Sequence, residues 1–266
     1  MIHIIKKPTD TPEDNSTGMV VSALKKKNVP YKFLDLDNVN TFNPGIEDEL
    51  IWVCGIRQDG TQFEKLSALD LSNTVVNNPE AIAICASKVQ TTARLINAGV
   101  PTPETIFTNS KDEVRTFLSK HGKVVYKPVY GFDGNGIYPM SDINELGEEP
   151  PYYIQEFVKN NCDYRVFVID GEAVGAIRRS SDSFAHNIHQ GGSGEALTDI
   201  PDEMARIAAE AAKSIGIDYC GVDLLPWEDS YLVLEVNGTP NWHCMGVPIP
   251  EFIADYLIEK EKSIRA

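Results

Sequence analysis

Two acids and an amide near the end of the chain are the residues best suited to chemistry. Asp223 and Glu235 lie in the runs "GVDLLP" and "YLVLEVN", which read as two strands joined by a turn at "PWEDS". Because side chains alternate along a strand, Asn237 shares the face of Glu235, and Asp223 can point from the same face of this hairpin. Bringing such groups together is costly unless a cation neutralises them. Their oxygen donors predict a magnesium or manganese site.

A softer metal is the alternative reading of the same region. His243 and Cys244 follow in "EVNGTPNWHC", and nitrogen and sulfur are the donors that zinc prefers. Adjacent residues rarely point into one coordination shell, and no second pair of such ligands lies nearby in the sequence. Zinc at His243 and Cys244 therefore stays as the minor alternative.

A glycine-rich loop is the candidate for binding phosphate. In "KPVYGFDGNG", Lys127 ends a predicted strand, and Gly131, Gly134 and Gly136 follow it. Glycines let backbone amides approach an anion, and the lysine adds a point charge, so the pattern suits nucleotide phosphates. It is neither a Walker loop nor a Rossmann fingerprint, because the lysine precedes the glycines and a strand follows them. A simple hairpin turn would carry the same glycines.

The stretch "YIQEFVKNNCDYRVFVIDG" is the candidate for binding a nucleoside. The connection after Glu156 offers backbone groups to an adenine edge, and the carboxylate of Asp163, close to Arg165, can accept both ribose hydroxyls. An edge strand with solvated charges is the alternative reading.

The elements that position these residues change character near residue 77. Before it, short apolar runs alternate with helical stretches, which predicts a small, mainly parallel α/β unit. After it, "SKVQTTARLINAG" reads as a helix, and "YYIQEFV", "YRVFVID" and "EAVGAIRR" read as strands of one antiparallel sheet. Further helices are expected from Pro201 and after Pro250. The predicted fold class is mixed α/β, of the α+β kind.

Composition limits the partners of this chain of 266 residues. A formal charge of −15 would repel a phosphate backbone, so we expect no nucleic acid partner, although a local basic pocket for a nucleotide is compatible with it. No run approaches the length of about 20 apolar residues that a membrane span needs. The opening "MIHIIKKPTD" lacks the apolar block of a secretion signal, so we expect a cytoplasmic location. The five cysteines contain no Cys-x-x-Cys pair and are expected to be reduced thiols.

Taken in order, Lys88, Lys127 with its glycine loop, "QEFV", "DYR", "AIRR", "NIHQGG", "GVD" and "EVN" resemble the ATP-grasp superfamily, specifically the RimK-type carboxylate–amine ligases. The resemblance runs from about residue 79 to 239. It implies an ATP-grasp domain over 78–266, with two subdomains, about 100–155 and about 156–266, that clasp ATP. The unit over 1–77 would then be the small domain that precedes the grasp fold.

The resemblance also implies a role for each candidate residue. Lys88 and Lys127 would contact the nucleotide phosphates, under a lid that carries the three glycines. The residues implied for the nucleoside are Gln155, Glu156 and Val158 at adenine and Asp163 at ribose. The residues implied for two Mg²⁺ or Mn²⁺ ions are Asp223, Glu235 and Asn237. The residues implied near the γ-phosphate and the acyl group are Arg165, Arg178 and Asn187.

The activity implied is an ATP-dependent amide ligation that releases ADP and phosphate through an acyl phosphate. The segment "EVNGTPNWHC" is most similar to archaeal ligases that add an α-linked glutamate to tetrahydromethanopterin, which implies ATP, L-glutamate and a pterin-type carboxylate as substrates. Trp242 and His243 would form the acceptor wall, unless Trp242 only caps the core and His243 is only solvated. A peptide, carrier-protein or other small-acid acceptor, and a non-catalytic nucleotide-binding module, are the alternatives. Self-association stays open.

Two departures from wider family patterns bear on these roles. Gln190 stands where the ribosomal-protein ligases usually carry arginine, which leaves the acceptor open. Gly221 stands where the D-alanine ligases have an arginine. The second departure moves the transition-state cation to Arg178 or Arg179.

Overall fold

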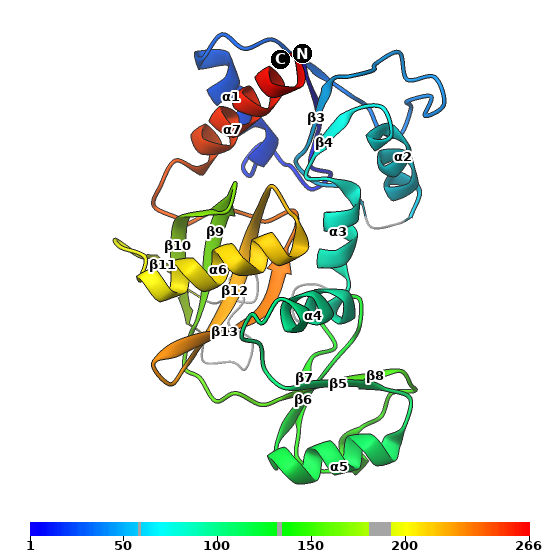
Figure 1. The fold of residues 1–266 in the computed structure, drawn as a ribbon, viewed down its shortest axis with the longest axis vertical. Helices are drawn as coiled ribbons and strands as arrows, with labels where there is room; N and C mark the ends of the chain where they lie inside the picture. Colours follow the sequence, from blue (N-terminus) through cyan, green and yellow to red (C-terminus); the bar gives the residue numbers. More distant parts are fainter. Residues whose placement is uncertain (58–59, 132–134, 181–192) are drawn as a thin grey trace.

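The structure is a computed structural model that describes residues 1–57, 60–131, 135–180 and 193–266. Three sheets follow one another along its long axis (Figure 1). We call them the N-terminal sheet, the central sheet and the lid sheet. The mixed α/β fold class expected from the sequence is confirmed. Within the described residues, no helix is long and apolar enough to cross a membrane.

The N-terminal sheet is parallel, with the order β2-β1-β3-β4. Its strands are β1 (Ile2–Ile5), β2 (Tyr31–Phe33), β3 (Leu50–Val53) and β4 (Thr74–Val76). Both inner strands are buried along their whole length, as expected of a parallel sheet that is covered on both faces. Helices α1 (Ser16–Lys26) and α2 (Thr61–Asp70) pack on opposite faces of it.

The last helix of the chain completes this N-terminal unit. Helix α7 (Ile249–Ile264) packs against α1 and β3, and its Ile253 and Leu257 share one core with Ile2 and Trp52 (Figure 1). A division at residue 77 therefore differs from the packing, since a segment expected in the second domain covers a face of the first. The apolar stripe of α7 predicted a buried face, but a stripe does not identify the surface it covers.

The central sheet is antiparallel, with the order β11-β10-β9-β12-β13. Its strands are β9 (Asp163–Ile169), β10 (Glu172–Ser180), β11 (Ser193–Ala196), β12 (Tyr219–Trp227) and β13 (Ser230–Asn237). Helix α6 (Asp202–Ile215) packs on one face, together with parts of α3 (Pro79–Ala86) and α4 (Lys88–Asn97). Alternate side chains point to the other face, which carries the charged candidates.

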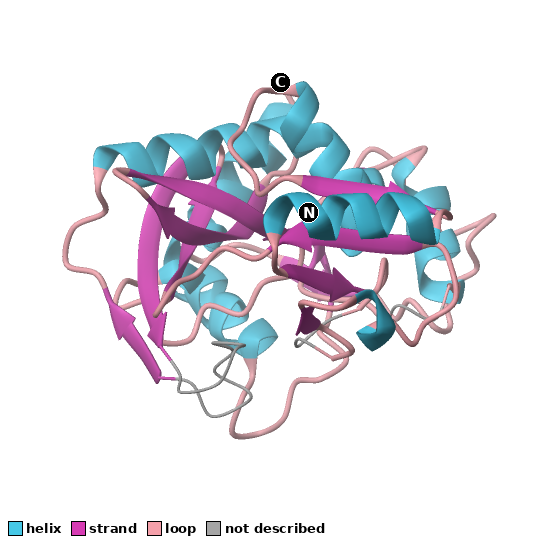
Figure 2. Cartoon of the chain, turned by 90° about the horizontal axis from the view of Figure 1, so that it is seen from below, coloured by secondary structure: helices cyan, strands magenta, loops and turns pink. Residues whose placement is uncertain are grey.

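The lid sheet is antiparallel, with the order β5-β8-β6-β7. It contains β5 (Thr105–Thr108), β6 (Val124–Lys127), β7 (Tyr138–Met140) and β8 (Tyr152–Glu156). Helix α5 (Lys111–His121) covers it, and a short 3₁₀ turn, η1 (Ile143–Glu145), closes the edge of its core. Figure 2 shows the same molecule from the lid end, with α5 in front of these strands.

Strand β8 corrects one expectation. The run "YYIQEFV" was predicted to pair with the two runs that follow it, but β8 pairs with β5 and β6 in a different sheet. The reason is physical: alternation of apolar and polar residues indicates that a strand is half-buried, and it does not determine which strand lies beside it. The segment after β8 is consequently a connection between two sheets.

Candidate active site

Four charged side chains form a row across the open face of the central sheet. We call Asp163, Arg165, Arg179 and Asp223 the charged row. Arg165 donates from Nε and Nη2 to the two Asp223 oxygens at 2.7 and 2.8 Å. Arg179 donates from Nε to Asp163 at 2.6 Å, and its Nη2 lies 3.0 Å from Asp223 Oδ2. The register explains the row, because Asp163 opposes Arg179 and Arg165 opposes Asp223 across neighbouring strands.

Burial makes the charges of this row interdependent. Asp223 is only 4% exposed. Burial by itself raises the pKa of its carboxyl, but the adjacent guanidinium groups of Arg165 and Arg179 outweigh this and hold the pKa well below its usual range. The pKa of Arg179 is raised, because its two carboxylate partners outweigh the effect of its burial. Removing one member would leave an uncompensated buried charge.

Glu235 and Asn237 extend the row onto β13. Glu235 lies directly opposite Asp223, and Asn237 lies opposite Gly221. Asn237 donates from Nδ2 to the Gly221 carbonyl at 3.3 Å, so its side-chain oxygen is directed elsewhere. These neighbours thus present two carboxylates and one amide oxygen at the end of a hairpin, as the sequence predicted.

Oxygen donors of this kind fit magnesium better than zinc. Within the described residues, no group of three or more His, Cys, Asp or Glu side chains comes together to enclose a metal. A magnesium ion held by one or two carboxylates completes its coordination with water and substrate phosphates. Among the described residues, Asp223 Oδ1 accepts one hydrogen bond, from Arg165 Nε, and a carboxylate oxygen has a second acceptor position. The donor set therefore fits an ion that arrives together with a nucleotide.

Two lysines approach this face from the lid side. Lys127, at the end of β6, donates to Gln155 Oε1 at 2.5 Å. Burial lowers the pKa of Lys127 to about 8, with Glu235 opposing the shift and Lys88 adding to it. Lys88, at the start of α4, donates from Nζ to the Gly131 carbonyl at 3.0 Å, which ties the helix to the loop that follows β6. Both cations thus lie at the base of the glycine loop.

The three side chains expected at adenine contact other residues of the protein. Gln155 contacts Lys127. The Glu156 carboxylate accepts from the Glu104 backbone N–H at 2.8 Å and lies 3.6 Å from His121 Nδ1. Val158 is buried in a small cluster with Leu225 and Leu232 of the central sheet. What the segment 156–158 can offer a purine is consequently its backbone rather than these side chains.

Arg178 differs from the expectation. Successive side chains of a strand point to opposite faces of the sheet, so Arg178 lies on the face opposite to Arg179 and the charged row. There it is exposed, beside Tyr164. Arg179, which the sequence could not distinguish from Arg178, is the one of the two that belongs to the row, together with Arg165. Of the remaining candidates, Gly131 and Gly136 flank the loop, with Gly136 at a φ of 72°. Gly134 and Asn187 lie outside the described residues.

The two candidate acceptor residues after β13, Trp242 and His243, lie in different environments. Trp242 is 5% exposed and packs edge-on against Phe167, with ring centroids 6.3 Å apart, so the reading that it caps the core is the one the packing supports. His243 is half-exposed, and its Nε2 lies 2.7 Å from Asp14 of the loop before α1. Cys244 is exposed, at a φ of 67°. His243 thus bridges to the N-terminal unit through Asp14.

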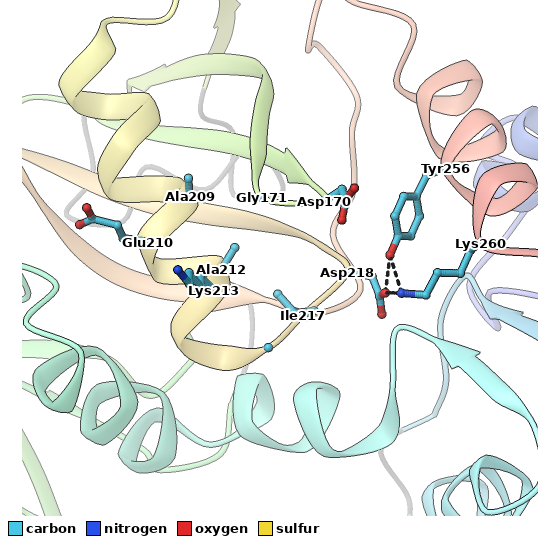
Figure 3. Close-up of a pocket in the computed structure, with 11 residues that line it drawn as sticks. Asp170, Gly171, Ala209, Glu210, Ala212, Lys213, Ile217, Asp218, Tyr256 and Lys260 are labelled. Carbon is cyan, nitrogen blue, oxygen red and sulfur yellow. Dashed lines mark hydrogen bonds and ion pairs between the residues drawn. The ribbon is translucent and has the colours of Figure 1, made fainter. Parts of the chain in front are cut away.

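A surface hollow of about 440 Å³ lies elsewhere, at the opposite end of the central sheet. Asp170 and Asp218 lie on its wall, and the Tyr256 hydroxyl and Lys260 Nζ bind Asp218 at 2.5 and 3.0 Å (Figure 3). None of the residues of the charged row lines it. The hollow and the charged row are therefore separate features at two ends of the central sheet.

Comparison with solved structures defines the class of protein. The ATP-grasp ligase PsnB, solved with a minimal precursor, Mg and ADP, superimposes with a TM-score of 0.77 at 22% identity, over 98% of this chain and 97% of that one. The fold is consequently that of the ATP-grasp ligases.

The family follows from sequence. The model of the RimK-like ATP-grasp domain matches residues 85–258. The tetrahydromethanopterin:α-L-glutamate ligase of Methanocaldococcus jannaschii is 33% identical, over 91% of this chain and 92% of that protein. The protein of that name from Methanosarcina acetivorans is 32% identical, over 74% of each. The chain belongs to the RimK-like ATP-grasp family, and it is an ATP-dependent C–N ligase, as the ordered motifs predicted.

Proposed function

We propose that the chain joins the α-amine of L-glutamate to the carboxylate of a pterin cofactor of the tetrahydromethanopterin type. The observation that carries this proposal is the similarity to the M. jannaschii ligase, which covers nearly the whole of both chains rather than the ATP-grasp domain alone. Residues 1–84, which include the four strands of the N-terminal sheet, lie outside the match to the family model. A match that includes these residues supports a common acceptor as well as a common chemistry.

The nucleotide would lie between the lid sheet and the central sheet. Lys88 and Lys127 would bind its phosphates, under the loop that carries Gly131 and Gly136. The backbone of 156–158 would hold the purine, and Asp163 would accept the ribose hydroxyls. Asp163 binds Arg179 of the charged row, and Lys127 is near enough to Glu235 and Lys88 for both to affect its pKa.

Glu235, Asn237 and the remaining acceptor position of Asp223 would hold magnesium, and we propose two ions, with manganese as the substitute. The metal supplies neutralisation of the triphosphate charge when bound. Arg165 already shares Asp223 with Arg179, so loading the site would let either guanidinium turn from carboxylate to phosphate. Both arginines remain protonated, because their carboxylate partners raise the pKa of each guanidinium above its already high usual value.

The ligation then balances in two steps. An acceptor carboxylate oxygen forms a bond to the γ-phosphorus while the bond between that phosphorus and the β,γ-bridging oxygen breaks, giving an acyl phosphate and ADP. The glutamate amine adds to the acyl carbon, phosphate leaves, and the amine loses a proton. Arg165 and Arg179 would stabilise charge on the transferred phosphoryl group. Asn187 would belong beside the acyl group by the resemblance, and Arg178 would not take part.

The acceptor would be bound where the central sheet meets the N-terminal unit. His243 pairs with Asp14 at this junction, so an imidazole and a carboxylate are available there. Trp242, from the core beneath, would support the segment rather than contact the acceptor.

An assay of ADP release with product detection by mass spectrometry tests the proposal. ATP, Mg²⁺ and L-glutamate are supplied with a pterin carboxylate, a glutamate-rich peptide, or no acceptor. We expect ADP and a glutamyl-pterin amide only with the pterin, and loss of both in Asp223→Asn, because that change removes a negative metal ligand. Product with the peptide alone would assign a peptide acceptor instead. ATP binding with no ADP release from any acceptor would indicate a non-catalytic nucleotide-binding module.

A further inference from the structure

A chain of buried polar groups lies behind Lys127. Gln155 is 1% exposed; its Oε1 accepts from Lys127, and its Nε2 donates to Thr105 Oγ1 at 3.0 Å and approaches the Tyr153 hydroxyl at 3.5 Å. The Tyr153 hydroxyl in turn lies 2.7 Å from Thr92 Oγ1. We call Thr92, Tyr153, Gln155 and Lys127 the buried polar chain. Unpaired groups at such depth would be costly, so each partner constrains the next.

Donor and acceptor chemistry determines how the Gln155 amide is oriented next to Lys127. An ammonium group has three donors and no acceptor, so the oxygen of the Gln155 amide must face Lys127. The amide nitrogen must then find acceptors on the other side, and Thr105 and Tyr153 are the hydroxyls available there. The position of the lysine amine is therefore determined by an amide that is itself held from behind.

The chain also connects the two elements that carry the lysines. Thr92 lies four residues after Lys88 on helix α4, so the two side chains share a face of that helix. Tyr153 and Gln155 belong to β8, which pairs with β6 and so with Lys127. The buried polar chain thus spans from the helix of Lys88 to the strand of Lys127.

We propose that Gln155 is a positioning residue that acts through Lys127: it holds the lysine amine where a phosphate oxygen is bound, and it does not itself contact the nucleotide. Thr92 and Tyr153 extend this support to helix α4. The inference rests on the proposed function, because it takes Lys127 as a phosphate ligand. It replaces an adenine contact for Gln155 with a role in phosphate binding.

A double-mutant cycle on ATP affinity tests it, with titration calorimetry of Mg·ATP against wild type, Gln155→Met, Lys127→Ala and the double variant. Methionine matches the length of glutamine and removes both hydrogen-bonding ends. We expect Gln155→Met to weaken ATP binding about tenfold, the range expected for a lost hydrogen bond to a charged group. The double variant should bind ATP no more weakly than Lys127→Ala alone, since Gln155 then has no lysine to position. Additive losses would overturn the inference, as would an affinity of Gln155→Met within about twofold of wild type.

Two neighbouring buried threonines give a matched control that does not depend on how well Gln155→Met folds. The Thr92 hydroxyl bonds the Tyr153 hydroxyl, whereas the Thr91 hydroxyl donates to the Ile84 carbonyl, away from the buried polar chain. We expect Thr92→Val to weaken ATP binding about fivefold and Thr91→Val to leave it unchanged. Equal losses of ATP affinity in Thr92→Val and Thr91→Val would mean that Thr92 contributes only through packing, which would overturn the role of the buried polar chain. If wild type itself fails to bind ATP, the proposed function fails, and not merely the role of Gln155.

Discussion

Arg179 and Arg178 are adjacent in the sequence and opposite in surroundings. The guanidinium of Arg179 bridges two buried carboxylates, whereas that of Arg178 is exposed beside Tyr164 and Cys162. A lysine keeps a positive charge but lacks the planar fork that binds two partners at once. The two positions therefore offer the same substitution in two environments.

We expect Arg179→Lys to lower kcat/KM for ATP by about tenfold or more, because one ammonium group cannot serve both Asp163 and Asp223. Arg178→Lys should stay within about twofold of wild type, as is usual for an exposed site. ADP release measures both, and thermal unfolding reports whether the fold survives. Equal losses in the two variants would contradict the assignment of Arg179 to the reacting face.

Lys127 provides a prediction on pH. Its pKa of about 8 means that the free enzyme carries this charge below pH 8 and loses it above. Since the ammonium form binds phosphate, kcat/KM for ATP should fall on the alkaline side of about pH 8. Lys127→Arg keeps its charge throughout this range, so its profile should lack that alkaline limb. Measuring kcat/KM for ATP from about pH 6 to 10 in wild type and Lys127→Arg tests this prediction. The same alkaline decline in both proteins would assign the titration to another group.

At the scale of elements, the lid sheet joins the rest of the molecule through the segments before β5 and after β8. Glu104 and Glu156 hold these two segments together: the backbone N–H of Glu156 donates to the Glu104 carbonyl at 2.8 Å, and the Glu156 carboxylate accepts from the Glu104 N–H. The first segment is also tied to β13, because the Thr102 hydroxyl donates to the Val233 carbonyl at 2.9 Å. The base of the lid is consequently a joint built from hydrogen bonds to main-chain groups, two of which involve a side chain.

Glu156→Ala should weaken this joint and leave the choice of base unchanged. Its carboxylate faces Glu104 and His121, so truncation frees one backbone N–H and removes no contact to a purine. We expect a loss of about 1–2 kcal/mol in the free energy of unfolding, with the ratio of ATP to GTP turnover equal to that of wild type. Glu156→Gln retains an acceptor oxygen and is the matched control. A relaxed ATP preference in Glu156→Ala alone would return the carboxylate to the purine site.

The sequence predicted the site residues that share one local hairpin better than those whose partners come from distant strands. Asp223, Glu235 and Asn237 were predicted to share a face because their hairpin is local, and the register places Asp223 opposite Glu235. Arg179 and Gln155 were assigned less well, since their partners come from other strands or other sheets. Alternation gives two faces and does not say which is buried, and charge alone does not distinguish an arginine facing the site from one facing solvent.

At the scale of the whole molecule, the N-terminal unit and the ATP-grasp region share one core. Ile4, Trp52, Phe167, Trp242 and Leu257 belong to a single cluster, although they come from both ends of the chain and its middle. The Tyr219 hydroxyl accepts from Trp52 Nε1 at 3.1 Å and donates to the Val53 carbonyl at 3.0 Å. The two regions are thus expected to unfold together.

Leu257→Ala tests this shared core. The side chain is fully buried, so its truncation should cost about 2–5 kcal/mol of stability. Calorimetry should show one transition shifted to lower temperature, with ATP affinity retained below it. Glu259→Ala, exposed on the same helix, should leave the transition unchanged. A separate early transition for the N-terminal unit would contradict a common core.

The packing of α7 on α1 and β3 has a consequence for how the protein is made. On the ribosome, the residues of β1, α1 and β3 emerge well before α7, the helix that covers their apolar face. Domains ordinarily fold in the order of their synthesis. Here the earlier segment must wait for the later one. A nascent chain stalled before Ile249 therefore exposes Ile2, Leu24 and Trp52 to chaperones that bind apolar surface, and this engagement should end only once α7 has emerged.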